Sequence, residues 1–205
     1  MTEAARSLAR SVLAEHLHRG RQGRASGTAG VTVRERTGVA VASIAARKGK
    51  SAELSAKIKA RTGLELPASP RMVATGHLSF AWSAPGQWFA MADGEDGAAF
   101  GDDLALDLSG LASVTDQTDG RVILRVSGTN VRETLAKGCM LDLHPVVFKV
   151  ADTAITPVAL LNVQITRLAD DAGAAVFELA VMRSFAASLW HWLEASAAEF
   201  GLEVG

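Results

Sequence analysis

The feature that most constrains this fold is an order of segments that occurs twice. The first copy has an apolar run at 39–45, a helical pattern at 51–61, alternating segments on both sides of Pro85-Gly86, and a weaker helical pattern at 98–106. Proline fixes φ at the second position of a tight turn and glycine accepts a positive φ at the third. The dipeptide therefore predicts a hairpin between the two alternating segments.

The second copy repeats this order. An alternating run at 121–127 precedes a helical pattern at 130–137, and strands at 158–168 and 174–182 flank a hairpin signal at 170–173. The last helix is predicted to begin with Ser184 as its N-cap and to end at Gly201. Neighbouring strands joined by hairpins favour antiparallel sheets with helices on one side. We therefore predict an α+β protein of two β-α-β-β-α repeats with mostly antiparallel sheets and a long C-terminal helix.

The N-terminal segment differs in composition from the rest. Residues 4–18 could form a short amphipathic helix, and the basic, glycine-rich stretch 20–27 reads as a connector. We expect 1–28 to be an arm that either frays or docks on another chain, followed by an α+β half at 29–112 and a second at 113–205. The arm carries arginines but no apolar core of a secretory signal, so we expect a cytoplasmic protein.

Composition excludes several classes of function. The net charge is −1, which gives no strong field to attract nucleic acid or an anionic membrane. No stretch approaches the roughly 20 apolar residues of a membrane span. Cys139 is the single cysteine, so the chain has no intrachain disulfide, and a cysteine-based metal site would need ligands from elsewhere.

Gly49-Lys50-Ser51 follows a strand and opens a helix, where a phosphate-binding loop would lie. That motif also needs a glycine five residues before Gly49, and the position holds Ile44. No Gly-x-Gly-x-x-Gly pattern occurs, so a dinucleotide-binding fold is not supported. We interpret the stretch as a basic loop before a solvated helix.

Cys139, Asp142 and His144 form the densest cluster of reactive side chains. A thiolate–imidazole pair with an orienting carboxylate is one interpretation. Catalytic partners usually converge from distant segments, however, and Pro145 holds His144 in an extended conformation. The favoured interpretation is a rigid, partly buried turn after a helix. His16, His18, His77 and His191 show no helical pairing, so we expect no metal site.

Trp190 and Trp192 lie on the predicted last helix and point about 200° apart. Both cannot face one core, so one must lie against a second surface. Either they anchor a subunit interface, or the two halves of the chain cover both. We take Trp190, Trp192, Cys139 and His144 as candidate interface residues, and assign no catalytic, cofactor-binding or metal residue.

Five stretches together resemble the gamma subunit of heterotetrameric sarcosine oxidase. They are VTVRER at 31–36, GQW at 86–88, VTDQTDGR at 114–121, KGCMLDLHP at 137–145 and RSFAASLWHWL at 183–193. The resemblance spans about residues 31–201. It implies a non-catalytic subunit of a flavin-dependent oxidase of sarcosine or another N-methyl amino acid, with alpha, beta and delta chains as partners.

The resemblance also implies where the cofactors lie. FAD, FMN, NAD and the tetrahydrofolate site belong to the alpha and beta chains, and zinc to the delta chain. The complex oxidises sarcosine to glycine, releasing hydrogen peroxide, while the methyl carbon leaves as formaldehyde or methylene-tetrahydrofolate.

The gamma family is in turn similar to a truncated aminomethyltransferase (T-protein) of the glycine cleavage system, which fits the repeat. The T-protein carries an acidic pair near its folate, and the matching place here is Leu161-Asn162. Because no carboxylate stands there, we expect this chain to lack an active site of its own. The alternative is a stand-alone folate-binding one-carbon transferase.

Overall fold

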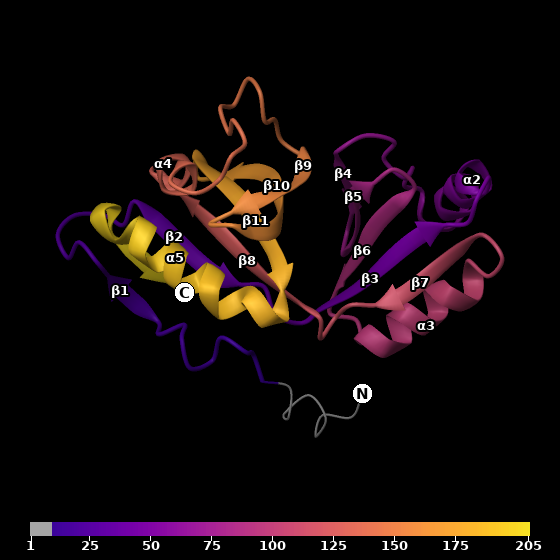
Figure 1. Ribbon diagram of the computed structural model, residues 1–205, viewed down its shortest axis with the longest axis horizontal. Helices are drawn as coiled ribbons and strands as arrows, with labels where there is room; N and C mark the ends of the chain where they lie inside the picture. The colour runs from indigo at the N-terminus through magenta and orange to yellow at the C-terminus, as the bar shows by residue number, and fades with distance from the viewer. Residues whose placement is uncertain (1–9) are drawn as a thin grey trace. The chain divides into compact units, whose positions relative to one another are not determined.

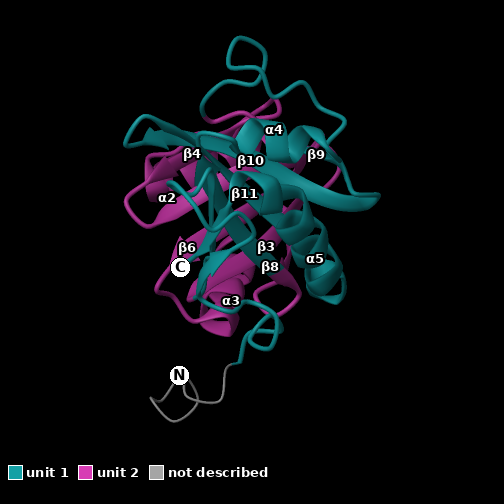
Figure 2. Ribbon diagram, turned by 90° about the vertical axis from the view of Figure 1, so that its left-hand side faces the viewer, with its two compact units in different colours: residues 1–37, 122–150, 155–205 teal, residues 38–121, 151–154 magenta. Residues whose placement is uncertain are grey.

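The computed structural model describes residues 10–205. The chain forms two compact units, which Figure 2 shows in different colours. Unit 1 contains residues up to Thr37 together with 122–150 and 155–205, and unit 2 contains residues 38–121 and 151–154. These boundaries differ from the consecutive halves expected at 29–112 and 113–205. The difference arises because residues 31–35 pair with strands of the later part of the chain.

Unit 2 is a five-stranded antiparallel sheet with two helices (Figure 1). The sheet has the order β4-β5-β6-β3-β7, so the hairpin predicted at Pro85-Gly86 joins β5 to β6. Gly86 has φ 71°, as the turn requires. The elements are β3 (Val39–Ala46), α2 (Ser51–Thr62), β4 (Met72–Thr75), β5 (Leu78–Ala84), β6 (Gln87–Asp93), α3 (Gly97–Asp107) and β7 (Ala112–Asp116).

One face of this sheet and both helices form the core of unit 2. Leu54 and Ile58, at i and i+4 on α2, are buried together with Leu104 of α3. They share this core with side chains that alternate along the strands, such as Ile44 and Phe80. Burying a leucine, isoleucine or phenylalanine side chain contributes roughly 1.5–3 kcal/mol, which explains why both helices lie on this face.

Unit 1 is a seven-stranded sheet in the order β1-β12-β2-β8-β11-β10-β9. All the pairings given for its strands are antiparallel except that of β12 with β2. Helices α4 and α5 contact each other and β11. The elements are β1 (Gly20–Gln22), β2 (Val31–Glu35), β8 (Arg121–Gly128), α4 (Val131–Ala136), β9 (Thr153–Val158), β10 (Leu161–Asp171), β11 (Ala174–Met182), η1 (Arg183–Phe185), α5 (Ala186–Ala197), η2 (Ala198–Phe200) and β12 (Leu202–Val204).

The predicted repeat is present, with one more strand in the middle and another at the end. From β3 to β7 and again from β8 to β12 the order is β-α-β-β-β-α-β, the short 3-10 turns aside. In unit 2 the last strand pairs with the first, β7 with β3. In unit 1 the corresponding strands β12 and β8 are separated by β2, which pairs with both. The α+β class with mostly antiparallel sheets is confirmed.

Three local predictions need correction. The strand expected at 158–168 is interrupted, because β9 ends at Val158 and a turn at Ala159 and Leu160 precedes β10. Ser184 lies in the 3-10 turn η1, and α5 begins after Phe185 without a side-chain cap, so the predicted N-cap is wrong. The helix expected at 4–18 lies partly outside the described residues, and the described part forms a turn at 12–16.

The described part of the arm belongs to unit 1 and packs against its sheet. Strand β1 pairs with β12, and Leu13 is fully buried. The Ser11 hydroxyl donates to the carboxylate of Glu35 on β2, with O–O distances of 2.7 and 2.6 Å. Across residues 10–205, no helix is long and apolar enough to cross a membrane.

Candidate functional site

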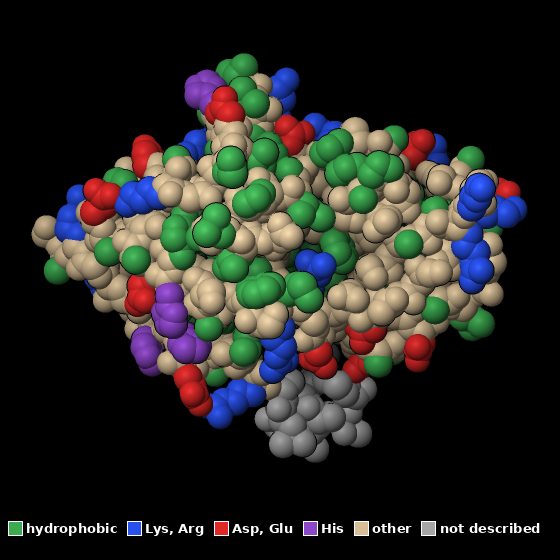
Figure 3. Space-filling view, viewed as in Figure 1, with side chains coloured by type: hydrophobic (Ala, Val, Ile, Leu, Met, Phe, Trp, Pro, Cys, Tyr) green, Lys and Arg blue, Asp and Glu red, His purple; other side chains and the backbone are tan. Residues whose placement is uncertain are grey.

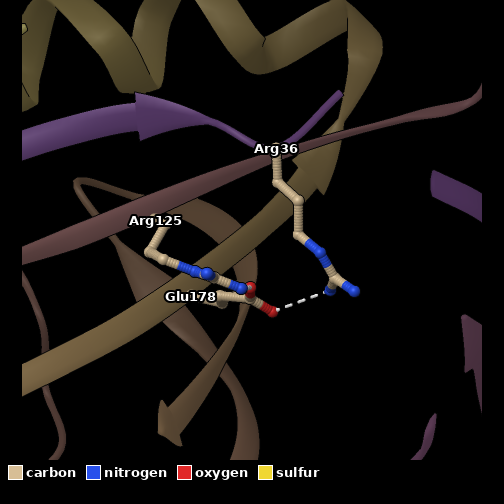
Figure 4. Close-up of polar contacts among 3 residues, drawn as sticks. All are labelled: Arg36, Arg125 and Glu178. Carbon is tan, nitrogen blue, oxygen red and sulfur yellow. Dashed lines mark hydrogen bonds and ion pairs between the residues drawn. The ribbon is translucent and has the colours of Figure 1, made fainter. Parts of the chain in front are cut away.

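Two arginines form ion pairs with the buried carboxylate of Glu178 in unit 1. Glu178 lies on β11, and its neighbours Phe177 and Leu179 point to the opposite face of the sheet. Arg125 of β8 donates from Nη2 and Nε to Oε1 of Glu178 at 2.6 and 3.1 Å. Arg36, just after β2, donates from Nη1 to Oε2 at 3.2 Å (Figure 4). Three strands therefore bring one carboxylate and two guanidinium groups together.

The cluster lies beside a cavity of about 730 Å³, lined by Arg34, Arg36 and Arg125 among others. Arg34 stands directly opposite Arg125 in the β2–β8 register. Like charges facing each other across strands are destabilising, so the Glu178 carboxylate offsets the repulsion on this face. Each carboxylate oxygen of Glu178 accepts a hydrogen bond from an arginine, so the carboxylate links β11 to β8 and to the end of β2.

Sequence reasoning missed this cluster, although a signal was present. Glu178 is a charged residue inside an otherwise apolar alternating strand, Val176 to Val181. A carboxylate in such a strand rarely stays buried without cationic partners. The partners themselves could not be named from the sequence, because they lie 142 and 53 residues away.

Cys139, Asp142 and His144 lie in the loop between α4 and β9. Burial raises the pKa of the Cys139 thiol, while a backbone hydrogen bond at Leu141 opposes the shift. The Asp142 carboxylate accepts from the backbone N–H of His144 at 2.9 Å, and Nδ1 of His144 accepts from the N–H of Val146 at 3.3 Å. These side chains shape the loop, which fits the favoured interpretation of a rigid turn. A neutral buried thiol is a poor nucleophile.

The two tryptophans of α5 have different environments. Trp190 is 0% exposed, whereas Trp192 is partly exposed. Trp192 lies close to Gly138: a Cβ added at Gly138 would come within 2.7 Å of the Trp192 ring. The surface that Trp192 packs against is therefore the end of α4 in the same unit. Of the four candidate interface residues, Trp190 and Cys139 are buried and His144 is exposed. Their contact with a partner stays a prediction.

The remaining sequence motifs make local contacts. Lys50 of the Gly49-Lys50-Ser51 stretch pairs with Glu53 at 2.7 Å on the solvent-facing side of α2, whose other side is buried. His16 and His191 do meet, with ring centroids 5.1 Å apart, although they are distant in sequence. Among residues 10–205, no group of three or more histidine, cysteine, aspartate or glutamate side chains could hold a metal ion.

The fold is shared with a protein of known structure. The chain resembles the aminomethyltransferase T of the glycine cleavage system from Bartonella henselae, with 16% identity and a TM-score of 0.61. The match covers 94% of this chain but 50% of that one, so the likeness shows the fold alone.

The family follows from the sequence. Residues 45–199 match the sarcosine oxidase, gamma subunit family, and the chain belongs to it. It is also similar to a chain of the heterotetrameric sarcosine oxidase from Corynebacterium sp. U-96, solved in complex with pyrrole 2-carboxylate. That match has 25% identity and a TM-score of 0.79, and covers 94% of this chain and 96% of the other. No curated protein matches the chain significantly.

Proposed function

We propose that this chain is a structural subunit of a four-chain, flavin-dependent sarcosine oxidase. The observation that carries the proposal is family membership over residues 45–199, supported by similarity to a chain of a heterotetrameric sarcosine oxidase along nearly the whole length of both chains. The partners would be alpha, beta and delta subunits, which would hold FAD, FMN, NAD, tetrahydrofolate and zinc.

The proposed complex oxidises the N–methyl bond of sarcosine. A flavin held by the partner subunits would supply the redox chemistry, in which two electrons and two protons from sarcosine would reduce oxygen to hydrogen peroxide. Water then releases glycine and formaldehyde from the oxidised amine, or tetrahydrofolate takes the methylene group. Every redox group in this scheme lies in the partner subunits, so this chain contributes stability and correct assembly.

The residues of this chain support a non-catalytic role. The densest reactive cluster, at Cys139, Asp142 and His144, is used in shaping a loop. The carboxylate of Glu178 is held by two arginines. At Leu161-Asn162, where β10 begins, no carboxylate is present to serve folate chemistry.

Purification of the isolated chain and of the co-expressed four-chain complex tests the proposal. We expect the isolated chain to be colourless and inactive towards sarcosine, and the complex to be yellow, to contain this chain in equal proportion, and to produce hydrogen peroxide. A complex of the other three chains that is equally stable and active without this one would contradict the proposal.

The alternative is independent folate chemistry, which the T-protein-like fold alone suggests. Titration calorimetry of the isolated chain with tetrahydrofolate separates the two functions. We expect no heat of binding at micromolar concentrations. Saturable micromolar binding by the isolated chain would favour the folate-binding alternative.

A further inference from the structure

Exposed apolar side chains are concentrated on one loop and one turn of unit 1. Of the nine large hydrophobic residues that are exposed within residues 10–205, five lie on this loop and turn, and Ile155 lies next to them in sequence on β9. Met140 is 81% exposed and Leu160 is 96% exposed. Single exposed hydrophobic residues scattered over a surface are ordinary, whereas apolar side chains gathered in one region are typical of interaction sites. We define the loop patch as Met140, Val146, Val147, Val150 and Leu160.

Buried side chains and a hydrogen bond from α4 fix the loop that carries this patch. Leu143 and Phe148 are buried, and the Phe148 ring stacks on Phe177 of β11 with centroids 6.5 Å apart. Arg132 of α4 donates from Nε to the Leu143 carbonyl at 3.1 Å. In Figure 1 the loop projects between α4 and β9, and Figure 3 shows hydrophobic and charged side chains together on this projection. The loop therefore presents its valines from a fixed position.

The turn that carries Leu160 has an unfavourable backbone. Ala159 and Leu160 have φ values of 51° and 68°, in the left-handed region. The hairpin between β10 and β11 also has two turn residues with positive φ, but there the second residue is a glycine, Gly173. A leucine in this region is strained, and its nearly complete exposure means that few contacts within the chain offset the strain. Residues with strained backbone conformations cluster at functional sites.

The turn and the loop are joined in space. Cys139 forms a β-bridge with Val158, and the N–H of Ala159 donates to the carbonyl of Gly138 at 3.1 Å. The bridge is antiparallel, so Met140 and Leu160 lead away from it in opposite directions, on its two sides.

We propose that the loop patch docks this chain into an apolar depression on another subunit of the four-chain assembly. The inference rests on the proposed function, since the similar chain of nearly equal length belongs to a heterotetramer. Asp142, His144 and Lys149 are exposed around the patch and would form the polar rim of an interface. A standard interface buries about 800 Å² on each side, so the patch would be its centre.

A partner subunit fits this surface better than the other occupants. A symmetric dimer requires a self-complementary surface, whereas a projecting loop fits a depression. An anionic membrane would favour a basic rim with aromatic residues, but this rim has mixed charge and the patch consists of valine, methionine and leucine.

The test uses the four-chain complex purified through a tag on another subunit. The double variant Val146→Asp/Val147→Asp places two charges in the patch at positions exposed enough for the chain to fold. Leu106→Asp is the matched control, because Leu106 is 80% exposed on α3 of unit 2. We expect the double variant to bind the other subunits more than 100-fold more weakly, and the control to bind like wild type. Leu160→Gly should raise the melting temperature of the isolated chain but weaken assembly.

The outcomes separate this inference from the proposed function. If wild type is not retained by the tagged complex, the proposed function fails and the inference with it. If wild type and the double variant are retained equally, the inference alone is wrong. Light scattering on the isolated chain tests whether the patch binds a second copy of this chain instead. A wild-type dimer that is absent in the double variant would assign the patch to a second copy and overturn the inference.

Discussion

Replacing Glu178 with glutamine removes the negative charge that two arginines share while keeping the size of the side chain. Breaking a buried ion pair by removing one partner costs about 3–5 kcal/mol. The Arg36 side chain is 15% exposed but that of Arg125 is 47% exposed, so water offsets part of the loss at Arg125. We expect the free energy of unfolding to fall by about 2–3 kcal/mol. For a chain of this length that lowers the melting temperature by about 4–12 °C.

Urea denaturation followed by circular dichroism measures this change. Glu133→Gln is the matched control, because Glu133 is exposed on α4, and its effect should stay within about 0.5 kcal/mol. Arg36→Met, alone and combined with Glu178→Gln, completes a double-mutant cycle that should give a coupling energy of about 1 kcal/mol or more. If Glu178→Gln unfolds at the same urea concentration as wild type, the charge argument for this sheet face is refuted.

Three further predictions concern stability, thiol reactivity and packing. The Lys57 ammonium, at 2.9 Å, lowers the pKa of the Asp107 carboxyl, with burial opposing it and Arg61 adding to it. A carboxyl group whose pKa is lowered by folding stabilises the folded state at pH values above its unfolded pKa of about 4. This stabilisation is lost as the pH falls through the pKa of the folded state. Asp107→Asn should therefore cost up to about 1 kcal/mol at pH 7, and a gap that persists in melts at pH 2 would contradict this. Because burial raises the pKa of the Cys139 thiol, a colorimetric thiol reagent should label the isolated chain at pH 8 only in denaturant, and rapid native labelling would disprove that protection. Gly138→Ala should cost about 1–3 kcal/mol in urea melts because its Cβ would overlap the ring of Trp192, and an unchanged midpoint would show that the ring can move aside.

Local patterns in the sequence predicted most elements well. The alternation at Leu78, Phe80 and Trp82 and the turn at Pro85-Gly86 correspond to β5, β6 and their hairpin. These features succeed because side-chain period and turn geometry depend on near neighbours. The turn at Ala159 and Leu160 was missed for the same reason, since neither residue is typical of a positive φ.

The candidate sites depended on distant contacts and were predicted less well. The alternation around Glu178 placed its carboxylate on the opposite face from Phe177, but nothing local pointed to Arg36 and Arg125 as its partners. The opposite orientation of Trp190 and Trp192 was clear from helical geometry. That Trp192 lies against Gly138 followed only from the packing of α4 near α5.

The sequence by itself determined the α+β class, the repeated order of elements and, through five matching stretches, the family. Only the tertiary structure decided that β2 separates β8 from β12 in unit 1, while β3 and β7 pair directly in unit 2. Strand neighbours form through backbone hydrogen bonds, which are the same for every residue type, so short-range patterns do not specify which strands meet. The side chains that cross those strands, among them the arginines around Glu178, are brought together by that pairing.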